Sequence, residues 1–121
     1  MPSKILFVEY PKCSTCQKAK KWLEASGLAF EERPIKTQNP TEKELRTWHK
    51  RSGLPLKRFF NTSGMLYREM ELSKKLPDMS EDDMFALLAT DGMLVKRPLL
   101  VLGDTVLPGF KEADWKEALQ L

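Results

Sequence analysis

Two cysteines separated by two residues have the clearest chemistry in this sequence. Cys13 and Cys16 are the only cysteines, and they lie where an apolar run ending near Tyr10 gives way to a helical pattern. The free N–H groups and the positive dipole end of a helix stabilise a thiolate over a thiol. Cys16 lies one helical turn beyond Cys13, within its reach. The spacing predicts a redox pair in which Cys13 attacks and Cys16 resolves the intermediate.

Two other interpretations of the pair stay open. Half of a zinc site would need a second CxxC or a CxxH, and His49 is the only histidine in the chain. The cysteines could also be small buried residues without reactivity, which is common for cysteine. Their position at a loop-to-helix junction, beside Pro11 and Lys12, favours redox chemistry over both. Neither a metal nor a bound cofactor is expected.

A second candidate group, Arg97-Pro98, directly precedes an apolar run at 99–102. If that run is a strand of the same sheet as the first one, its start comes close to the cysteine loop. The guanidinium of Arg97 offers a fixed charge and planar donors to a thiolate or an oxyanion. The alternative is an ordinary surface arginine beside Lys96. By analogy with known folds, Pro98 is expected to follow a cis bond that turns the backbone toward the cysteines and prevents metal binding.

Further groups near Cys13 are expected to hold negative charge as it develops on sulfur or on an oxyanion. Lys12 adds a positive charge directly before the nucleophile. Ser14 and Thr15 lie at the start of the predicted helix, where backbone N–H groups are free. With Arg97, these residues make up the candidate anion-binding group.

The elements around the cysteines predict a βαβ unit. Residues 4–10 form a short apolar run typical of a buried strand, and residues 28–33 indicate a second strand closed by Pro34. Between them, from about residue 15 to 26, apolar side chains recur at three- and four-residue spacing, which predicts a helix. The two strands are expected to be parallel, with a right-handed crossover.

The middle of the chain, about residues 38–93, is predicted to be an all-helical insertion. Thr41 with Glu44 forms a capping box for one helix, and Ser80 with Asp83 caps another. Both signals satisfy backbone N–H groups that a helix leaves free at its start.

Within this insertion, the pattern also predicts which side chains are buried. The helix after Ser80 is expected to bury Met84, Leu87 and Leu88. His49 is expected on the polar side of the preceding helix, as a solvated residue without a catalytic role.

The end of the chain predicts two more strands and a helix. Residues 99–102 and 105–107, separated by Gly103 and Asp104, indicate a β-hairpin, and a helical pattern follows. Strands at both ends with helices between them predict an α/β fold: a small four-stranded mixed sheet flanked by helices. We expect a single domain over residues 1–121.

Composition excludes several classes of protein. The chain has 121 residues, with 20 Lys and Arg against 17 Asp and Glu, and the net charge of +3 is not gathered into a basic block, so nucleic acid is not an expected partner. The longest apolar runs are far shorter than the ~20 residues that cross a bilayer. With no signal-peptide pattern at its start, the protein is expected to be a cytoplasmic monomer, in a compartment that keeps thiols reduced.

Four segments resemble one known family. They are YPKCSTCQKA at positions 10–19, GLPLKRFFNT at 53–62, LVKRP at 94–98 and GFK at 109–111. Together they are similar to the arsenate-reductase-like (ArsC/Spx) family, over essentially the whole chain. The resemblance implies a thioredoxin-like (glutaredoxin-like) core with a helical insertion.

The resemblance also implies roles for individual residues. Cys13 corresponds to the nucleophile of the family's arsenate reductases and to the first switch cysteine of its Spx-type regulators, whereas Cys16 corresponds only to the second switch cysteine. Three arginines bind the oxyanion in the arsenate reductases, and the matching positions are Arg97, Lys57 and a position near Val106. A lysine lacks the bidentate fork of arginine, and a valine offers nothing to an oxyanion.

Three functions follow as expectations. The first is a thiol-disulfide oxidoreductase that acts on a disulfide, a glutathione mixed disulfide or an oxidised small substrate, with glutathione, glutaredoxin or thioredoxin as reductant. The second is an Spx-type redox-sensing regulator that binds RNA polymerase. The third is a glutaredoxin-coupled arsenate reductase.

Overall fold

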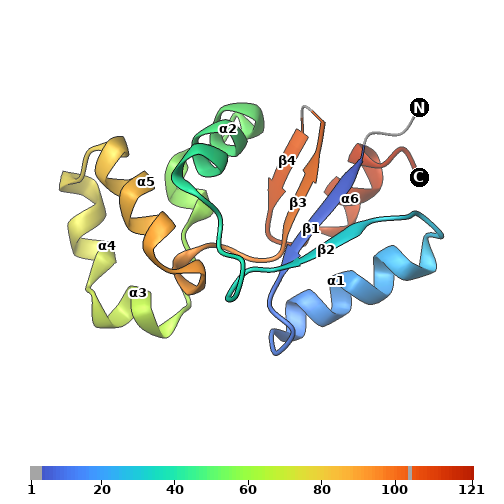
Figure 1. Ribbon diagram of the computed structural model, residues 1–121, viewed down its shortest axis with the longest axis horizontal. Helices are drawn as coiled ribbons and strands as arrows, with labels where there is room; N and C mark the ends of the chain where they lie inside the picture. The colour runs from blue at the N-terminus through green and yellow to red at the C-terminus, as the bar shows by residue number, and fades with distance from the viewer. Residues whose placement is uncertain (1–3, 104) are drawn as a thin grey trace.

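The computed structural model describes residues 4–103 and 105–121, shown in Figure 1. Strands lie at the two ends of the described chain, and short helices fill the middle. In order, the elements are β1 (Ile5–Glu9), α1 (Ser14–Ala25), β2 (Glu31–Pro34), α2 (Glu42–Ser52), the 3-10 helix η1 (Leu56–Phe59), α3 (Met65–Glu69), α4 (Leu72–Lys75), the 3-10 helix η2 (Leu76–Asp78), α5 (Glu81–Thr90), the 3-10 helix η3 (Gly92–Leu94), β3 (Leu99–Leu102), β4 (Thr105–Pro108) and α6 (Glu112–Ala118).

The four strands form one mixed sheet in the order β2-β1-β3-β4. β1 pairs with β2 in parallel and with β3 antiparallel, and β3 pairs with β4 antiparallel. Phe7 is central in this sheet, because it lies opposite Glu32 on one side and Leu100 on the other. The predicted α/β class, with a thioredoxin-like core and a parallel βαβ start, is confirmed.

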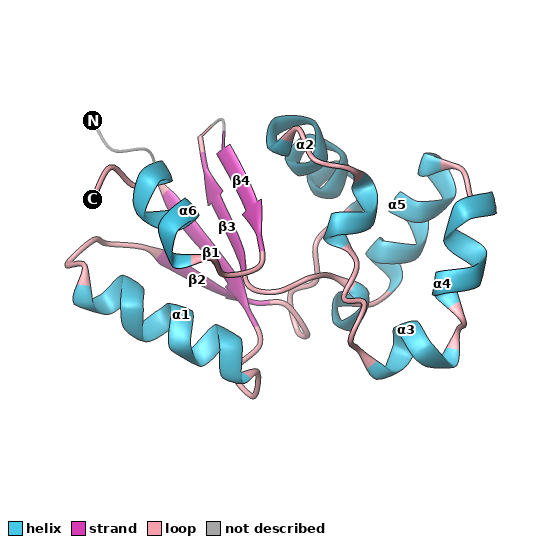
Figure 2. Ribbon diagram, turned by 180° about the vertical axis from the view of Figure 1, so that it is seen from behind, coloured by secondary structure: helices cyan, strands magenta, loops and turns pink. Residues whose placement is uncertain are grey.

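One face of the sheet is covered by α1 and α6, as Figure 2 shows. Ile5, Phe7 and Leu100 point to this side, where they form a buried cluster with Leu23 of α1 and Trp115 of α6. Alternate residues of a strand face opposite sides of a sheet, so the apolar run of β1 supplies two cores at once.

The other face is covered by helices of the inserted segment between β2 and β3. Val8 and Val101 point to this side and belong to the same buried cluster as Leu45 of α2 and Phe85 of α5. The capping box at Thr41 and Glu44 is present, as predicted. The inserted helices therefore share a core with the sheet.

Several elements differ from the sequence-based prediction. β2 begins at Glu31 and includes Pro34, since β2 is an edge strand, where the missing N–H of proline is tolerated. In α5 the fully buried side chains are Phe85 and Leu88, whereas Met84 and Leu87 are only partly buried against the core.

His49 also differs from its prediction. Its ring is half-buried, with its centroid 6.0 Å from that of Phe59 and 5.6 Å from that of Phe85. The packing of α5 on α2 encloses this position, which the pattern of α2 alone assigns to solvent. Asp104 of the predicted hairpin turn lies outside the described residues. Across the described chain, no helix has the length and apolar character needed to span a membrane.

Candidate active site

Cys13 is the N-cap residue of α1, so its side chain replaces the hydrogen-bond acceptor that the first turn lacks. The sulfur of Cys13 accepts the N–H of Cys16 at 3.4 Å, and the N–H of Cys13 donates to the carbonyl of Tyr10 at 2.9 Å. The loop from Tyr10 to Cys13 is therefore a tight turn that directs this sulfur at the helix N-terminus. The helix begins at Ser14, one residue before the predicted start.

Cys16 lies on the inner face of α1, against the sheet, with only 1% of its surface exposed. Its sulfur accepts the backbone N–H of Tyr10 at 3.5 Å. Both cysteines are free thiols. One turn of helix thus places a half-exposed sulfur beside a buried one.

The two thiols differ in acidity for physical reasons. Burial opposes ionisation of Cys13, but the N–H and S–H groups of Cys16 stabilise its thiolate. The charge of Arg97 and the N–H of Thr15 add to this stabilisation, so the pKa of the Cys13 thiol lies below its ordinary value of 9.0. Burial, followed by the neighbouring sulfur of Cys13, raises the pKa of Cys16 to about 12. Cys13 is therefore the more acidic thiol of the pair, and Cys16 is the one that keeps its proton to higher pH.

Arg97 reaches the cysteines from the segment before β3. The Arg97–Pro98 peptide bond is cis, as expected. The guanidinium carbon lies 5.2 Å from the centroid of the Tyr10 ring, and Nη1 donates to the carbonyl of Met93 at 3.3 Å. Its Nε is buried and has no hydrogen-bond partner among the described residues. Arg97 is thus held by the Tyr10 ring and by the Met93 carbonyl, and its Nε forms no hydrogen bond with the described residues.

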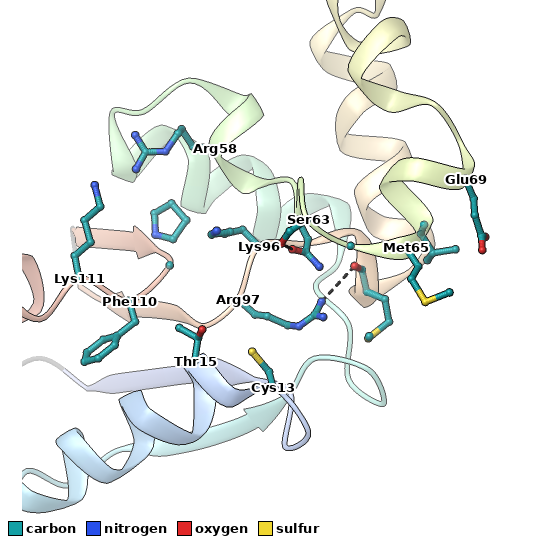
Figure 3. Close-up of a pocket in the computed structure, with 16 residues that line it drawn as sticks. Cys13, Thr15, Arg58, Ser63, Met65, Glu69, Lys96, Arg97, Phe110 and Lys111 are labelled. Atoms are coloured by element: carbon teal, nitrogen blue, oxygen red, sulfur yellow. Dashed lines mark hydrogen bonds between the residues drawn. The ribbon is translucent and has the colours of Figure 1, made fainter.

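Cys13 opens into a cavity of about 780 Å³. Cys13 and Thr15 lie on one side of it, with Arg58 and Lys111 across from them, as Figure 3 shows. Segments distant in sequence build its wall: the start of α1, the stretch from η1 through α3, the stretch from η3 to the start of β3, and the turn from β4 to α6. The lining residues are Cys13, Thr15, Arg58, Asn61, Ser63, Gly64, Met65, Leu66, Glu69, Met93, Lys96, Arg97, Pro108, Gly109, Phe110 and Lys111.

The predicted site residues are only partly gathered at this cavity. Cys13, Thr15 and Arg97 line it, whereas Lys12 and Ser14 are exposed and are not part of its wall. Pro98 is buried behind it, and its carbonyl accepts the N–H of Gly109, a lining residue, at 2.8 Å.

The assignment of Lys57 is corrected by the structure. Lys57 is exposed and lies outside the cavity wall, while the next residue, Arg58, lines it. Both belong to the 3-10 helix η1, where successive side chains point about 120° apart, so only one of the two can face the cavity. Val106 is buried in the core and supplies no cavity group.

Other cavity residues were missed by sequence reasoning. Arg58, Lys96 and Lys111 place three further cations around Cys13, and none of them has an acidic partner within 4.0 Å in the described part of the chain. Asn61 and Tyr10 were also missed as site residues. The motifs around them, GLPLKRFFNT and YPKCSTCQKA, were available as signals but did not specify which side chains face inward.

Metal ions in proteins are held by clusters of ligating side chains. The described residues contain no group of three or more His, Cys, Asp and Glu side chains placed to hold an ion. The arrangement of an acidified sulfur, a buried thiol and a ring of cations suits nucleophilic attack with stabilisation of negative charge.

Comparison with known proteins adds relatives over nearly the full length. The uncharacterized Bacillus subtilis protein YusI is 54% identical over 113 residues, which cover 93% of this chain and 96% of YusI. The regulatory protein MgsR of the same organism is 25% identical, covering 94% of this chain and 89% of MgsR.

A solved structure shows the same architecture. An ArsC-family-related protein from Bacteroides fragilis has a TM-score of 0.93 and 55% identity, covering 95% of this chain and 97% of the other. The sequence profile of the ArsC family matches residues 8–118, a span that begins within β1 and ends with α6. This span includes both cysteines and every residue of the cavity wall, and the chain therefore belongs to the ArsC family.

Proposed function

We propose that this protein is a thiol-disulfide oxidoreductase in which Cys13 is the nucleophile and Cys16 the resolving cysteine. One observation carries the proposal: the two sulfurs lie in one helical turn, and their environments shift the pKa of Cys13 down and that of Cys16 up to about 12. This difference makes the sulfur at the cavity the more readily ionised of the two and leaves the buried one as the thiol.

The reaction proceeds in two exchange steps. The Cys13 thiolate attacks one sulfur of a disulfide RSSR′, so that a Cys13–SR bond forms, the S–S bond breaks and R′S⁻ leaves with the electron pair. Cys16 then loses its proton to solvent or to the leaving thiolate, and attacks Cys13. This second step releases RS⁻ and leaves a Cys13–Cys16 disulfide. Substrate is reduced by two electrons, and the protein is oxidised by two.

The groups around Cys13 stabilise the negative charge that moves between sulfurs. Arg97 supplies a fixed charge, and the N–H groups of Thr15 and Cys16 point to the same sulfur. Such donors are most effective when they are already in place before reaction. A cellular thiol closes the cycle by reducing the Cys13–Cys16 disulfide and becoming oxidised itself. In the cytoplasm, glutathione, glutaredoxin or thioredoxin is the proposed reductant.

Two variants test the assignment. Cys13→Ser should abolish reduction of a disulfide substrate, while Cys16→Ser should accumulate a mixed disulfide on Cys13, visible by mass spectrometry as an adduct of one substrate half. Lys21→Ala, an exposed change on the same helix, serves as the control and should keep full activity. Full activity in Cys13→Ser refutes the proposal.

A second candidate function is redox-dependent regulation of transcription. It is favoured by the relative MgsR, which is named as a regulatory protein, and by the Cys13–Cys16 pair, whose oxidation would change the surface at α1. In this case the protein binds RNA polymerase in one redox state. The test is to incubate purified bacterial RNA polymerase with the oxidised and with the reduced protein. If the polymerase binds the protein in neither state, the regulator function is refuted.

The third candidate function is arsenate reduction. Arsenate-dependent oxidation of glutathione, with glutaredoxin present, would identify the protein as an arsenate reductase.

A further inference from the structure

Asn61 lines the Cys13 cavity with a side chain that is fixed by hydrogen bonds. The residue is only 9% exposed, and it lies in the loop between η1 and α3. Its backbone N–H donates to the carbonyl of Leu94 at 2.8 Å, and its carbonyl accepts the N–H of Gly64 at 3.0 Å. Its Oδ1 accepts the hydroxyl of Ser63 at 3.3 Å. Every hydrogen-bonding group of Asn61 is thereby engaged except Nδ2, for which the described residues provide no acceptor.

Gly64 lets this amide lie against the backbone. A Cβ atom at position 64 would be 2.6 Å from Nδ2 of Asn61, closer than such atoms approach. Glycine at this position therefore preserves the orientation of the amide, and any other residue would displace it. The loop presents one fixed, unused N–H₂ donor to the cavity.

Arg97 lines the same cavity, and its guanidinium is held by the carbonyl of Met93 and the ring of Tyr10. Its Nε is buried, so this atom is not open to a ligand in the cavity. Nδ2 of Asn61 is thus the donor that remains for a ligand oxygen on this side of the cavity.

The cavity indicates what kind of ligand carries that oxygen. At about 780 Å³ it belongs to the size range of sites that enclose organic molecules, and it far exceeds the needs of a lone oxyanion. Its wall combines the cations Arg58 and Lys111 with the apolar side chains of Leu66 and Phe110. A cysteinyl peptide with an acidic and an apolar neighbour matches these groups and offers main-chain carbonyl oxygens near its sulfur.

We propose that Asn61 is a specificity-determining residue, whose Nδ2 donates to a main-chain carbonyl oxygen of a cysteinyl peptide while Cys13 attacks the disulfide of that peptide. The inference rests on the proposed thiol-disulfide exchange and names its substrate class. The exchange itself is unchanged: a bond forms between Cys13 and the peptide sulfur, and the other half of the disulfide leaves as a thiolate.

The test compares two disulfides on the intact protein. One is the homodisulfide of an acetylated glutamyl-cysteinyl-leucine peptide, and the other is 2-hydroxyethyl disulfide, which has no carbonyl group. Asn61→Asp replaces the donor amide by a carboxylate and keeps the oxygen that Ser63 contacts. We expect kcat/KM for the peptide disulfide to fall by about tenfold, the loss of one good hydrogen bond. The rate with 2-hydroxyethyl disulfide should stay within about twofold of wild type.

Two controls separate recognition from other effects. Thr62→Ala changes an exposed neighbour outside the cavity wall and should behave as wild type with both disulfides. Alkylation of Cys13 by iodoacetamide, followed against pH, reports whether the new carboxylate alters the thiol, and Asn61→Ala removes the donor without adding charge. A tenfold loss for the peptide disulfide in both Asn61 variants supports the proposal.

The outcomes distinguish a failure of the proposed exchange reaction from a failure of the proposed role of Asn61. If the wild type reduces neither disulfide, the proposed function fails. If the wild type reduces both, and the Asn61 variants lose equal activity on both or on neither, the exchange reaction stands and the role of Asn61 is overturned. If the variants unfold, the wild-type protein alone still tests the role of Asn61. Equal kcat/KM for the peptide disulfide and for 2-hydroxyethyl disulfide would overturn that role.

Discussion

At the level of single residues, Tyr10 connects the three reactive groups of the site. Its N–H donates to the sulfur of Cys16 at 3.5 Å, its carbonyl accepts the N–H of Cys13 at 2.9 Å, and its ring lies 5.2 Å from the guanidinium carbon of Arg97. The first two contacts use the backbone, and only the third depends on the side chain. Tyr10 is thus a positioning residue for Arg97.

Removing the charge of Arg97 should make Cys13 less acidic. Arg97 favours the thiolate, so Arg97→Met raises the pKa of Cys13 and lowers the thiolate fraction at neutral pH. We expect alkylation by iodoacetamide at pH 7 to slow on the order of tenfold. Tyr10→Leu should slow it in the same direction but by less, whereas Tyr10→Phe, which keeps the ring, should not.

The pH profile of Cys13 alkylation shows whether a slower rate in these variants comes from a higher pKa of Cys13. At a pH above the Cys13 pKa of every variant, the alkylation rates should converge. Arg46→Met removes an equal charge from the distant surface of α2 and should leave the profile unchanged. A slowing of equal size at all pH values would show that Arg97 controls access to the sulfur and not its ionisation.

Glu9 is a buried acid at the end of β1, with 3% of its surface exposed. Burial, followed by the charge of Glu32 and a hydrogen bond with it, raises the pKa of Glu9 from 4.5 to about 7. Glu32 in turn pairs with Lys20 of α1 at 3.0 Å. Since the folded protein keeps a proton that the unfolded chain releases above pH 4.5, folding stability should fall as pH rises from about 4.5 to 7.

Glu9→Gln should remove this dependence. The raised pKa corresponds to about 3 kcal/mol of stability lost across that window, so the variant should be more stable than wild type at pH 8 by about 1 to 3 kcal/mol. Urea denaturation at pH 5 and pH 8 measures the difference. Glu31→Gln, an exposed change on the neighbouring strand β2, should leave the slope as it is. An identical pH slope in Glu9→Gln would contradict the assignment.

At the level of elements, Arg33 joins the edge strand β2 to the start of α2. Its Nη1 and Nη2 donate to the carboxylate of Glu44 at 2.6 and 2.8 Å, and its other hydrogen bonds reach the carbonyls of Gln38 and Asn39. Glu44 also completes the capping box with Thr41. The hydrogen bonds from Arg33 lower the pKa of Glu44 to about 2. One side chain therefore orients the first helix of the inserted segment against the sheet.

Glu44→Gln should weaken this connection without removing the cap, because glutamine also fits the third position of a capping box. We expect a loss of about 1 to 2 kcal/mol at pH 7, where the charged pair is fully formed. The wild type loses this contribution as pH falls from about 4.5 toward 2, so the two proteins should converge in stability near pH 2. Thermal unfolding at pH 7 and at low pH tests this.

Glu42→Gln is the matched control on the same helical turn. Its partner Arg46 lies 3.7 Å away on the surface, and such pairs contribute little. A change of less than about 0.5 kcal/mol is expected. Equal losses in the two variants would mean that Arg33 and Glu44 form an ordinary surface pair.

At the level of the whole molecule, the cavity exists only because the inserted helices pack against the sheet. Its wall combines Cys13 from the βαβ start, Asn61 from the inserted segment and Phe110 from the turn after β4. Gly92 lies at the contact between these parts. A Cβ added there would be 2.0 Å from the carbonyl oxygen of Ile35, which follows β2.

Gly92→Ala should therefore separate the two parts and destabilise the protein by about 2 kcal/mol or more, since the contact is with backbone. Gly27→Ala is the control, because an added methyl group there meets nothing within 4 Å and only its φ of +79° opposes the change. A loss of about 1 kcal/mol is expected for Gly27→Ala. Denaturation curves for both variants test the difference, and equal losses would contradict the close approach at Gly92.

Much of the local structure could be predicted because its causes lie within a few residues. The alternation of apolar residues in β1, the caps at Thr41 and Ser80, and the thiol at the start of α1 each depend on neighbouring side chains and on backbone groups one turn away. The proximity of the Cys13 and Cys16 sulfurs belongs here as well, since one helical turn brings them together. These features follow from sequence spacing alone.

Contacts between distant segments were decided only by the tertiary structure. The choice of Arg58 over Lys57 for the cavity, the burial of Phe85, and the enclosure of His49 all depend on how η1, α2 and α5 pack together. The same holds for Asn61: its hydrogen-bond partner Leu94, and Cys13, which lines the same cavity, are more than thirty residues away along the chain. Periodicity assigns a residue to a face of its own helix, but only packing determines whether that face meets solvent, core or cavity, because the groups opposite it come from elsewhere in the chain.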